Sequence, residues 1–149
     1  MATIWFYHLL RSDLEAELPR LLEMTLKRGK RALVLASSPE RVEALAQHLW
    51  VYSDESFLPH GTAKDGRPEE QPVWLAEADE NANNADYLFL TDGASSVHLD
   101  LFERCHDIFD GRDPVALAAA RERWKALKAA GHELAYQRQK EGGGWELVA

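Results

Sequence analysis

Three cations recur at helical spacing within the segment 113–131, DPVALAAARERWKALKAAG. Arg121, Lys125 and Lys128 stand at positions i, i+4 and i+7, so a helix would place them along one line of its surface. Such a line of positive charge can hold an anionic ligand. An ordinary solvated helix face is the other interpretation, because Glu122 offsets the charge and cations are favoured near a helix C-terminus. The residue pattern alone leaves both interpretations open.

The segment that carries these cations has helix signals at both ends. Asp113 suits an N-cap, Pro114 fits the first helical position, and Gly131 stands where a left-handed C-cap is expected. Trp124 either forms one wall of an apolar slot beside the cations or belongs to the core. Apolar residues at helical spacing predict a buried stripe that includes Leu117, Ala120, Trp124 and Leu127.

Cys105 and His106 are adjacent, and such a pair could supply metal ligands or a nucleophile with its base. The chain has one Cys, so a cysteine-based zinc site lacks a second sulfur ligand. The six His residues are scattered, and no two of them stand at i, i+4. We therefore predict no catalytic residue, no metal site and no cofactor, and we expect a buried, inert thiol at Cys105.

A nucleotide-binding α/β domain would carry a Gly-rich turn after its first or second strand. The turns that follow the predicted strands 4–8 and 32–36 read LLRS and SSP, without glycine. Asp92 follows an apolar run, as a magnesium-positioning residue would, but Asp92 and Gly93 together also form an ordinary turn. A small nucleotide-binding or degenerate helicase-like α/β domain is kept as the alternative function.

The pattern of the whole chain predicts α/β architecture. The continuous apolar run 32–36 is typical of a parallel strand that helices cover on both faces. We predict a three-layer Rossmann-like domain with a mostly parallel central sheet, helices on both faces and a C-terminal β-hairpin within 132–148. Strand 4–8 is expected to lie beside strand 32–36. The further strands are predicted at 72–76, 86–90 and 104–109.

The first predicted helix begins with a capping-box pair, Ser12 and Glu15, and ends near Gly29. Pro19 interrupts its apolar period, so Pro19 either kinks the helix or marks its true start. A second helix follows Ser38 and runs to about residue 50.

Turn-forming residues between 51 and 71 predict a long loop, and long loops are often functional. Phe57 stands in this loop without periodic apolar partners. Its ring could therefore contact another protein, or it could fold back to cover the edge of the sheet.

Length and charge narrow the class of protein. A chain of 149 residues with 46% hydrophobic residues predicts one domain, 1–149. A formal net charge of -8 argues against broad contact with nucleic acid, so any work at DNA is expected to be indirect, through another protein. There is no signal-peptide pattern and no apolar run long enough for a membrane span, so we predict a cytoplasmic protein without membrane contact.

Four stretches, in this order along the chain, together resemble the chi subunit family of the bacterial DNA polymerase III holoenzyme. None of them is a signature alone, but together they cover almost the full length. They are FYHL (6–9), GKRALV (29–34), ESFLPH (55–60) and RERWK (121–125), the last followed by Ala130 and Gly131.

The resemblance implies a non-catalytic adaptor in DNA replication. In that family, chi joins the acidic C-terminal tail of the single-stranded DNA-binding protein, SSB, to the clamp loader through the psi subunit. The tail site would consist of Arg121, Trp124, Lys125 and Lys128. The surface that faces psi or the clamp loader would consist of Trp50, Phe57, Leu58, Pro59 and His60.

Two questions stay open under this resemblance. The acidic stretch 65–80 and the Gly-rich hairpin depart from better-known members, so the contact could be made through a psi partner or directly to the clamp loader. A general α/β interaction domain unrelated to replication is a third interpretation. It differs from the adaptor because it predicts no affinity for the SSB tail.

Overall fold

The computed structural model describes residues 3–53 and 58–149. Within these residues, seven strands form one sheet in the order β3-β2-β4-β5-β1-β6-β7. Neighbouring strands are parallel except for the antiparallel pair β6 and β7 at one edge. The strands are β1 (Thr3–Leu9), β2 (Ala32–Leu35), β3 (Val73–Ala76), β4 (Tyr87–Thr91), β5 (Arg104–Asp110), β6 (Glu133–Gln139) and β7 (Trp145–Leu147).

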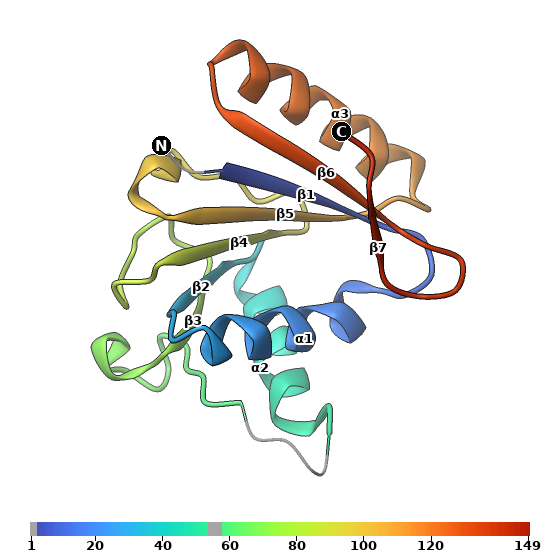
Figure 1. The fold of residues 1–149 in the computed structure, drawn as a ribbon. Coiled ribbons are helices and arrows are strands. Elements are labelled where there is room, and N and C mark those ends of the chain that lie inside the picture. The colour runs from blue at the N-terminus through green and yellow to red at the C-terminus, as the bar shows by residue number, and fades with distance from the viewer. Residues whose placement is uncertain (1–2, 54–57) are drawn as a thin grey trace.

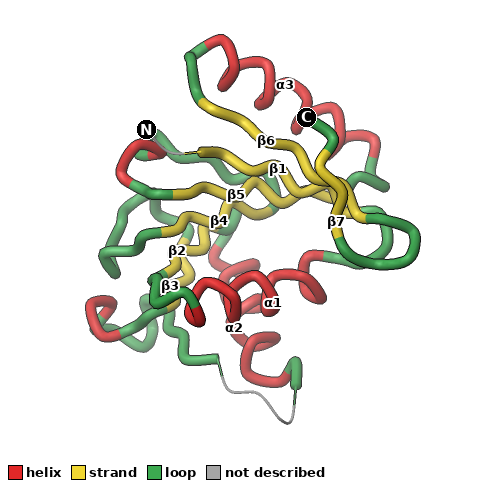
Figure 2. Tube along the Cα trace, viewed as in Figure 1, coloured by secondary structure: helices red, strands yellow, loops and turns green. Residues whose placement is uncertain are grey.

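Helices cover both faces of the sheet (Figure 1). On one face, α1 and α2 bury residues such as Leu18 and Leu45 in the same core cluster as β2 and β4. On the other face, α3 packs through Ala120 into a second cluster. The predicted three-layer α/β fold with a C-terminal hairpin is therefore confirmed (Figure 2). The helices are α1 (Leu14–Lys27), α2 (Pro39–Val51), α3 (Pro114–Ala129) and the short 3-10 helices η1 (Pro68–Glu70) and η2 (Leu99–Leu101).

The strands feed the two core clusters through alternate side chains, as the two-residue period of a strand requires. On β1, Tyr7 and Leu9 join the cluster under α1 and α2, whereas Ile4 and Phe6 join the cluster under α3. Every residue of β2 and of β4 is buried. The prediction that the run 32–36 is covered on both faces is thus confirmed.

The expected pairing of strand 4–8 with strand 32–36 is wrong, because β4 and β5 lie between β1 and β2. The physical reason is burial. The completely buried strands β2 and β4 need neighbours and helices around them, so they lie inside the sheet, and β5 continues this central block toward β1. Since parallel strands are joined by crossovers, sequence order does not fix which strands pair.

The first helix also differs from its expected start. The N-cap of α1 is Asp13, whose side chain accepts a hydrogen bond from the Ala16 backbone N–H at 3.0 Å, so the predicted Ser12 cap is wrong. The Ser12 hydroxyl instead donates to the Glu17 carboxylate at 2.8 Å. Asp and Ser are both good caps, and only the backbone geometry at residues 12 and 13 separates them.

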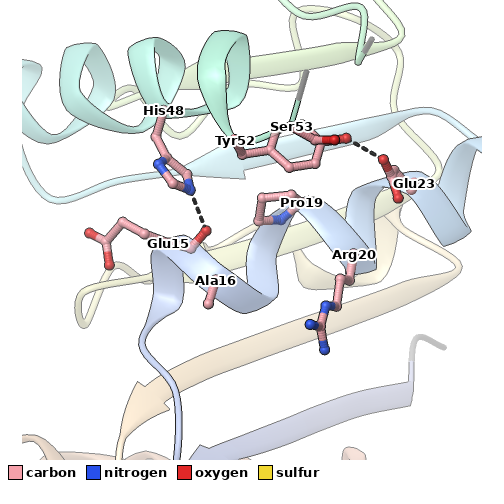
Figure 3. Close-up of a pocket in the computed structure, with 8 residues that line it drawn as sticks. All are labelled: Glu15, Ala16, Pro19, Arg20, Glu23, His48, Tyr52 and Ser53. Atoms are coloured by element: carbon pink, nitrogen blue, oxygen red, sulfur yellow. Dashed lines mark hydrogen bonds between the residues drawn. The ribbon is translucent and has the colours of Figure 1, made fainter. Parts of the chain in front are cut away.

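Pro19 lies inside α1, which continues past it to Lys27. A proline has no N–H, so the carbonyl of Glu15 loses its helical donor. Nε2 of His48 on α2 lies 2.5 Å from that carbonyl oxygen and donates in its place (Figure 3). The same groove between α1 and α2, of about 330 Å³, contains a hydrogen bond from the Tyr52 hydroxyl to Glu23. One histidine on α2 therefore compensates for the proline on α1.

His106, on β5, is buried, and its ring stacks on that of Phe89 with 4.2 Å between the ring centroids. Its Nδ1 donates to the Leu88 carbonyl at 3.1 Å. Burial, helped by the positive charge of Arg104, lowers the pKa of His106 to about 3. The folded protein therefore holds this ring neutral.

Replacing His106 by Phe should make stability less dependent on pH. The unfolded parent chain protonates this residue below its ordinary pKa of 6.5, whereas the folded chain stays neutral down to about 3. The parent should therefore lose up to ~1.4 kcal/mol of unfolding free energy per pH unit through this residue as the pH falls below 6.5.

Urea unfolding of both proteins across this pH range measures the difference. Other titrating groups act in both proteins, so the difference in slope isolates His106. Equal slopes would mean that the imidazole is already charged in the folded protein.

Candidate functional site

An ion pair buried beneath α3 sets the orientation of that helix. Arg123 directs its guanidinium inward, and its Nε and Nη2 donate to the two carboxylate oxygens of Asp107 on β5 at 2.7 and 2.9 Å. Asp107 is 2% exposed. Burial raises the pKa of Asp107, and the bonded guanidinium acts against that rise. Arg123 therefore holds α3 on the sheet, and its charge is not available to a ligand at the surface.

Trp124, the next residue, packs against the core cluster between α3 and the sheet. Its ring makes edge-on contacts with Phe6 at 5.3 Å and with Tyr136 at 5.6 Å between centroids. The side chain is only half-buried, and it packs against the core cluster without being enclosed by it. Trp124 thus anchors the helix and leaves part of an aromatic surface accessible.

The cations Arg121, Lys125 and Lys128 lie exposed along one flank of α3, and together they are called the basic strip. Lys125 is 3.5 Å from Glu122, and both side chains are more than 70% exposed, at 73% and 75%. Such an exposed pair is weak. Of the residues that the structure describes, none forms an ion pair with Arg121 or Lys128.

Helical geometry separates the exposed cations of α3 from the buried Arg123. Residues 121, 125 and 128 share a helix flank because they are separated by four and three positions, whereas 123 points to the sheet. The helix is fixed at both ends as predicted: Asp113 accepts from the Val115 N–H at 3.0 Å, and Gly131 adopts a left-handed φ of 92°. A fixed helix with free cations beside an aromatic edge can hold an anionic group next to an apolar one.

Only some residues of the second predicted group, which was expected to face psi or the clamp loader, lie at the surface. Trp50 is 54% exposed, and Pro59 is half-buried, whereas Leu58 and His60 lie in the interior. The ring nitrogens of His60 lie 2.7 Å from the Leu58 carbonyl and 3.0 Å from that of Ala46. Leu58 and His60 therefore support the surface from beneath rather than forming it.

The ring of His60 also packs against the ring of Trp50, with 4.5 Å between the ring centroids. Phe57, the fifth residue predicted here, lies outside the described residues. Trp50 is on α2, and Leu58 belongs to the core cluster under α1 and α2, whereas the basic strip is on α3, which covers the opposite face of the sheet (Figure 1). Among the described residues, Trp50 and the basic strip therefore lie on opposite sides of the sheet.

The turn after β1 is where an α/β sheet of this kind would bind a phosphate. The backbone N–H groups of Leu10, Arg11 and Ser12 all donate to the side-chain oxygen of Gln139, at 2.8, 2.8 and 3.2 Å. The amide nitrogen of Gln139 in turn donates to the Ser12 hydroxyl at 2.6 Å. The chain thus fills its own anion-binding turn, which disfavours a nucleotide at this place.

Asp92, the candidate for positioning magnesium, is held in an ion pair with Arg41 at 2.7 Å. The same guanidinium also contacts Glu15 at 3.0 Å. Asp92 adopts a φ of 53°, as expected of the ordinary turn that Asp92 and Gly93 could form. This edge of the sheet therefore presents internally paired carboxylates, an unfavourable surface for phosphates.

Cys105 is completely buried, as predicted. Burial first, and then the negative charge of Asp100, raises the pKa of its thiol to about 12. A thiol of that pKa is a poor nucleophile at neutral pH. No cluster of three or more His, Cys, Asp or Glu residues suited to a metal ion occurs in the described part of the chain. None of the helices in residues 3–53 and 58–149 has the length and apolar character of a membrane span.

Most of the chain is similar to one family of known proteins. Its residues 1–135 match the family model described as DNA polymerase III chi subunit, HolC. The chain therefore belongs to the DNA polymerase III chi subunit family. Family membership makes it an accessory subunit in DNA replication, and the resemblance drawn from the sequence is confirmed.

Two relatives are similar over parts of this chi-family chain. A protein of Rickettsia prowazekii (strain Madrid E), named "Probable DNA polymerase III subunit chi", is 32% identical over 71 residues, 48% of this chain. The match spans 43% of that relative's length. DNA polymerase III subunit chi of Escherichia coli (strain K12) is 29% identical over 107 residues, 71% of this chain and 72% of the relative. Residues beyond 135, including most of the C-terminal hairpin, lie outside the family match.

Sequence reasoning missed the residues that complete the surface around α3. Tyr136 and Arg138 stand on β6, a strand with only weak alternation, and neither follows a motif. The inward role of Arg123 was also missed, although its helical position, two residues from Arg121, places it away from the basic strip. That position was the one signal from which its role could have been predicted.

Replacing Arg123 by Met should lower the free energy of unfolding by ~3–5 kcal/mol, because the carboxylate of Asp107 would stay buried without its partner. Arg121→Met is the matched control, since the same change at an exposed position of the same helix should cost less than about 0.5 kcal/mol. The double variant Arg123→Met, Asp107→Leu should regain most of the loss. Urea unfolding measures all three, and equal losses for Arg123→Met and Arg121→Met would contradict the buried role of Arg123.

Proposed function

We propose that this chain joins SSB to the clamp loader of DNA polymerase III, with α3 binding the acidic C-terminal tail of SSB. The observation that carries the proposal is the basic strip. In a chain with a net charge of -8, Arg121 and Lys128 stand exposed without an ion pair among the described residues, beside the half-buried ring of Trp124. Family membership supplies the context of DNA replication.

The chemistry of the tail fits this flank of α3. An acidic peptide that ends in Phe brings negative charges, a terminal carboxylate and one aromatic ring. The guanidinium of Arg121 can receive the terminal carboxylate with two parallel hydrogen bonds, and the ammonium groups of Lys125 and Lys128 can neutralise the acidic side chains. The aromatic ring can pack on the accessible part of Trp124. The chain would then contact DNA only indirectly, through SSB.

Arg121→Ala and Lys125→Ala should each weaken binding of a labelled SSB tail peptide about three- to tenfold, because each removes a charge that the peptide needs. Binding by the parent should weaken as salt is raised, and it should disappear when the terminal Phe is removed. Fluorescence anisotropy measures the affinities, and thermal unfolding checks that the fold is kept.

Arg67→Ala and Lys64→Ala provide matched controls. Both residues are exposed, at 78% and 79% of their side chains, and each already pairs with a nearby glutamate. Each of these variants also removes one positive charge, but at a position outside α3. Both should therefore bind the peptide like the parent. If the controls and the α3 variants lose affinity equally, the effect is one of net charge, and the basic strip is not the site.

The clamp-loader contact is proposed for Trp50 and Phe57, of which Trp50 is on α2 and not on α3. Trp50 is an exposed aromatic residue, and Val51 beside it is 64% exposed. Such an aromatic, with support from a buried Leu58 and His60, suits the anchor of a protein interface. The partner would be a psi subunit or the clamp-loader complex itself.

Trp50→Ala and Phe57→Ala should weaken capture of the psi subunit or clamp-loader complex at least tenfold and leave binding of the SSB tail unchanged. Surface-plasmon resonance with each partner in turn distinguishes the two sites. Arg121→Ala should give the reverse pattern. Loss of tail binding in Trp50→Ala would contradict the separation of the sites on opposite faces.

A further inference from the structure

The edge of the sheet beside α3 carries residues that extend the basic strip. On β6, Tyr136 and Arg138 pair in register with Phe6 and His8 of β1, so all four side chains point to the face that α3 covers. The Tyr136 hydroxyl lies 2.6 Å from Nδ1 of His8, and its ring contacts Trp124. Trp124 and Tyr136 thus form an aromatic corner between helix and strand.

Cations from both elements surround this corner. Burial raises the pKa of Tyr136, and the positive charges of Arg121 on α3 and Arg138 on β6 both act against that rise. The same two arginines, after burial, lower the pKa of His8. Arg121 and Arg138 therefore act on the same hydroxyl and the same imidazole, from two different elements.

Arg138 forms an ion pair with the carboxylate of Glu146. Its Nε and Nη2 donate to one oxygen of Glu146, at 3.0 and 2.7 Å, across the antiparallel pair of β6 and β7. The two side chains are 45% and 43% exposed, so the pair is open to solvent and can exchange. The neighbouring Trp145 points to the opposite face, against Tyr7, which leaves Glu146 on the side of α3.

We propose that Arg138 is an additional cation of the peptide site on α3, and that Glu146 competes with the acidic peptide for it. The proposal rests on the proposed function, because it names a further part of the same site. A carboxylate of the bound tail takes the place of the Glu146 carboxylate on Arg138, while the aromatic ring of the peptide lies at the corner of Trp124 and Tyr136. Glu146 then sets the affinity by occupying the arginine when the peptide is absent.

This competitor belongs to the C-terminal hairpin, beyond the residues 1–135 that match the family. Arg138 and Glu146 both lie outside that match. The regulation is therefore inferred for this chain from its own contacts.

Removing the charge of Glu146 tests the competition. Glu146→Gln should bind the labelled SSB tail peptide about three times more tightly than the parent, because Arg138 is released. Glu141→Gln is the matched control: it removes the same charge from the same hairpin, where Glu141 is 91% exposed and pairs with Arg11. This control should bind like the parent.

Arg138→Gln tests the cation itself and should weaken binding about threefold or more. In the double variant Arg138→Gln, Glu146→Gln, the gain from Glu146→Gln should vanish, since there is no arginine to release. Anisotropy titrations of the complete chain give all the affinities, and thermal unfolding checks each variant.

The outcomes separate this inference from the proposed function. Equal affinities of Glu146→Gln and Glu141→Gln, or a gain from Glu146→Gln that persists without Arg138, would overturn the competition while the parent still binds the peptide. Failure of the parent to bind the peptide at low salt would overturn the proposed function, and this inference with it.

Discussion

The buried ion pair between Arg123 and Asp107 is the contact on which the proposed working surface depends. It fixes the rotation of α3 about its axis, because both carboxylate oxygens of Asp107 are bonded to one guanidinium, at 2.7 and 2.9 Å. A buried charge is costly unless it is paired, so this contact strongly disfavours other rotations of the helix. Once Arg123 points to the sheet, helical periodicity alone places Arg121, Lys125 and Lys128 on an exposed flank. The position of the exposed basic strip therefore depends on the buried ion pair.

The rest of the fold divides the molecule into faces with different properties. The α1 and α2 face carries the exposed Trp50, supported by the buried His60, and the α3 face carries the basic strip. At the end of β1, where related folds bind phosphates, Gln139 occupies the three N–H groups of the turn. The carboxyl edge is thereby used for internal structure, because Gln139 ties the end of β6 to the turn that precedes α1. The proposed adaptor function, with two separated protein-binding faces, fits this arrangement better than a nucleotide-binding function does.

Local patterns predicted the parts of the structure that depend on local interactions. The caps of α3 at Asp113 and Gly131 and the burial of the run 32–36 follow from residue type and periodicity. Strand order was predicted wrongly, because pairing of parallel strands depends on contacts between distant segments. In the candidate site, the basic strip was visible as spacing, whereas Arg138 and its pairing with Glu146 needed the register of β6 and β7. A list of charges does not reveal which ones are already neutralised, and that knowledge comes from three-dimensional contacts.

Binding of the acidic SSB tail at α3 is tested by an NMR titration of the labelled protein with the tail peptide, followed at the indole resonances of the five Trp residues. Trp124 lies beside the basic strip, and Trp50 lies on the opposite face, so the two indoles report on different surfaces. Binding of the peptide at α3 should give a saturable shift of the Trp124 resonance, with the Trp50 resonance unchanged. A shift of Trp50 without a shift of Trp124 would contradict the assignment of the peptide to α3.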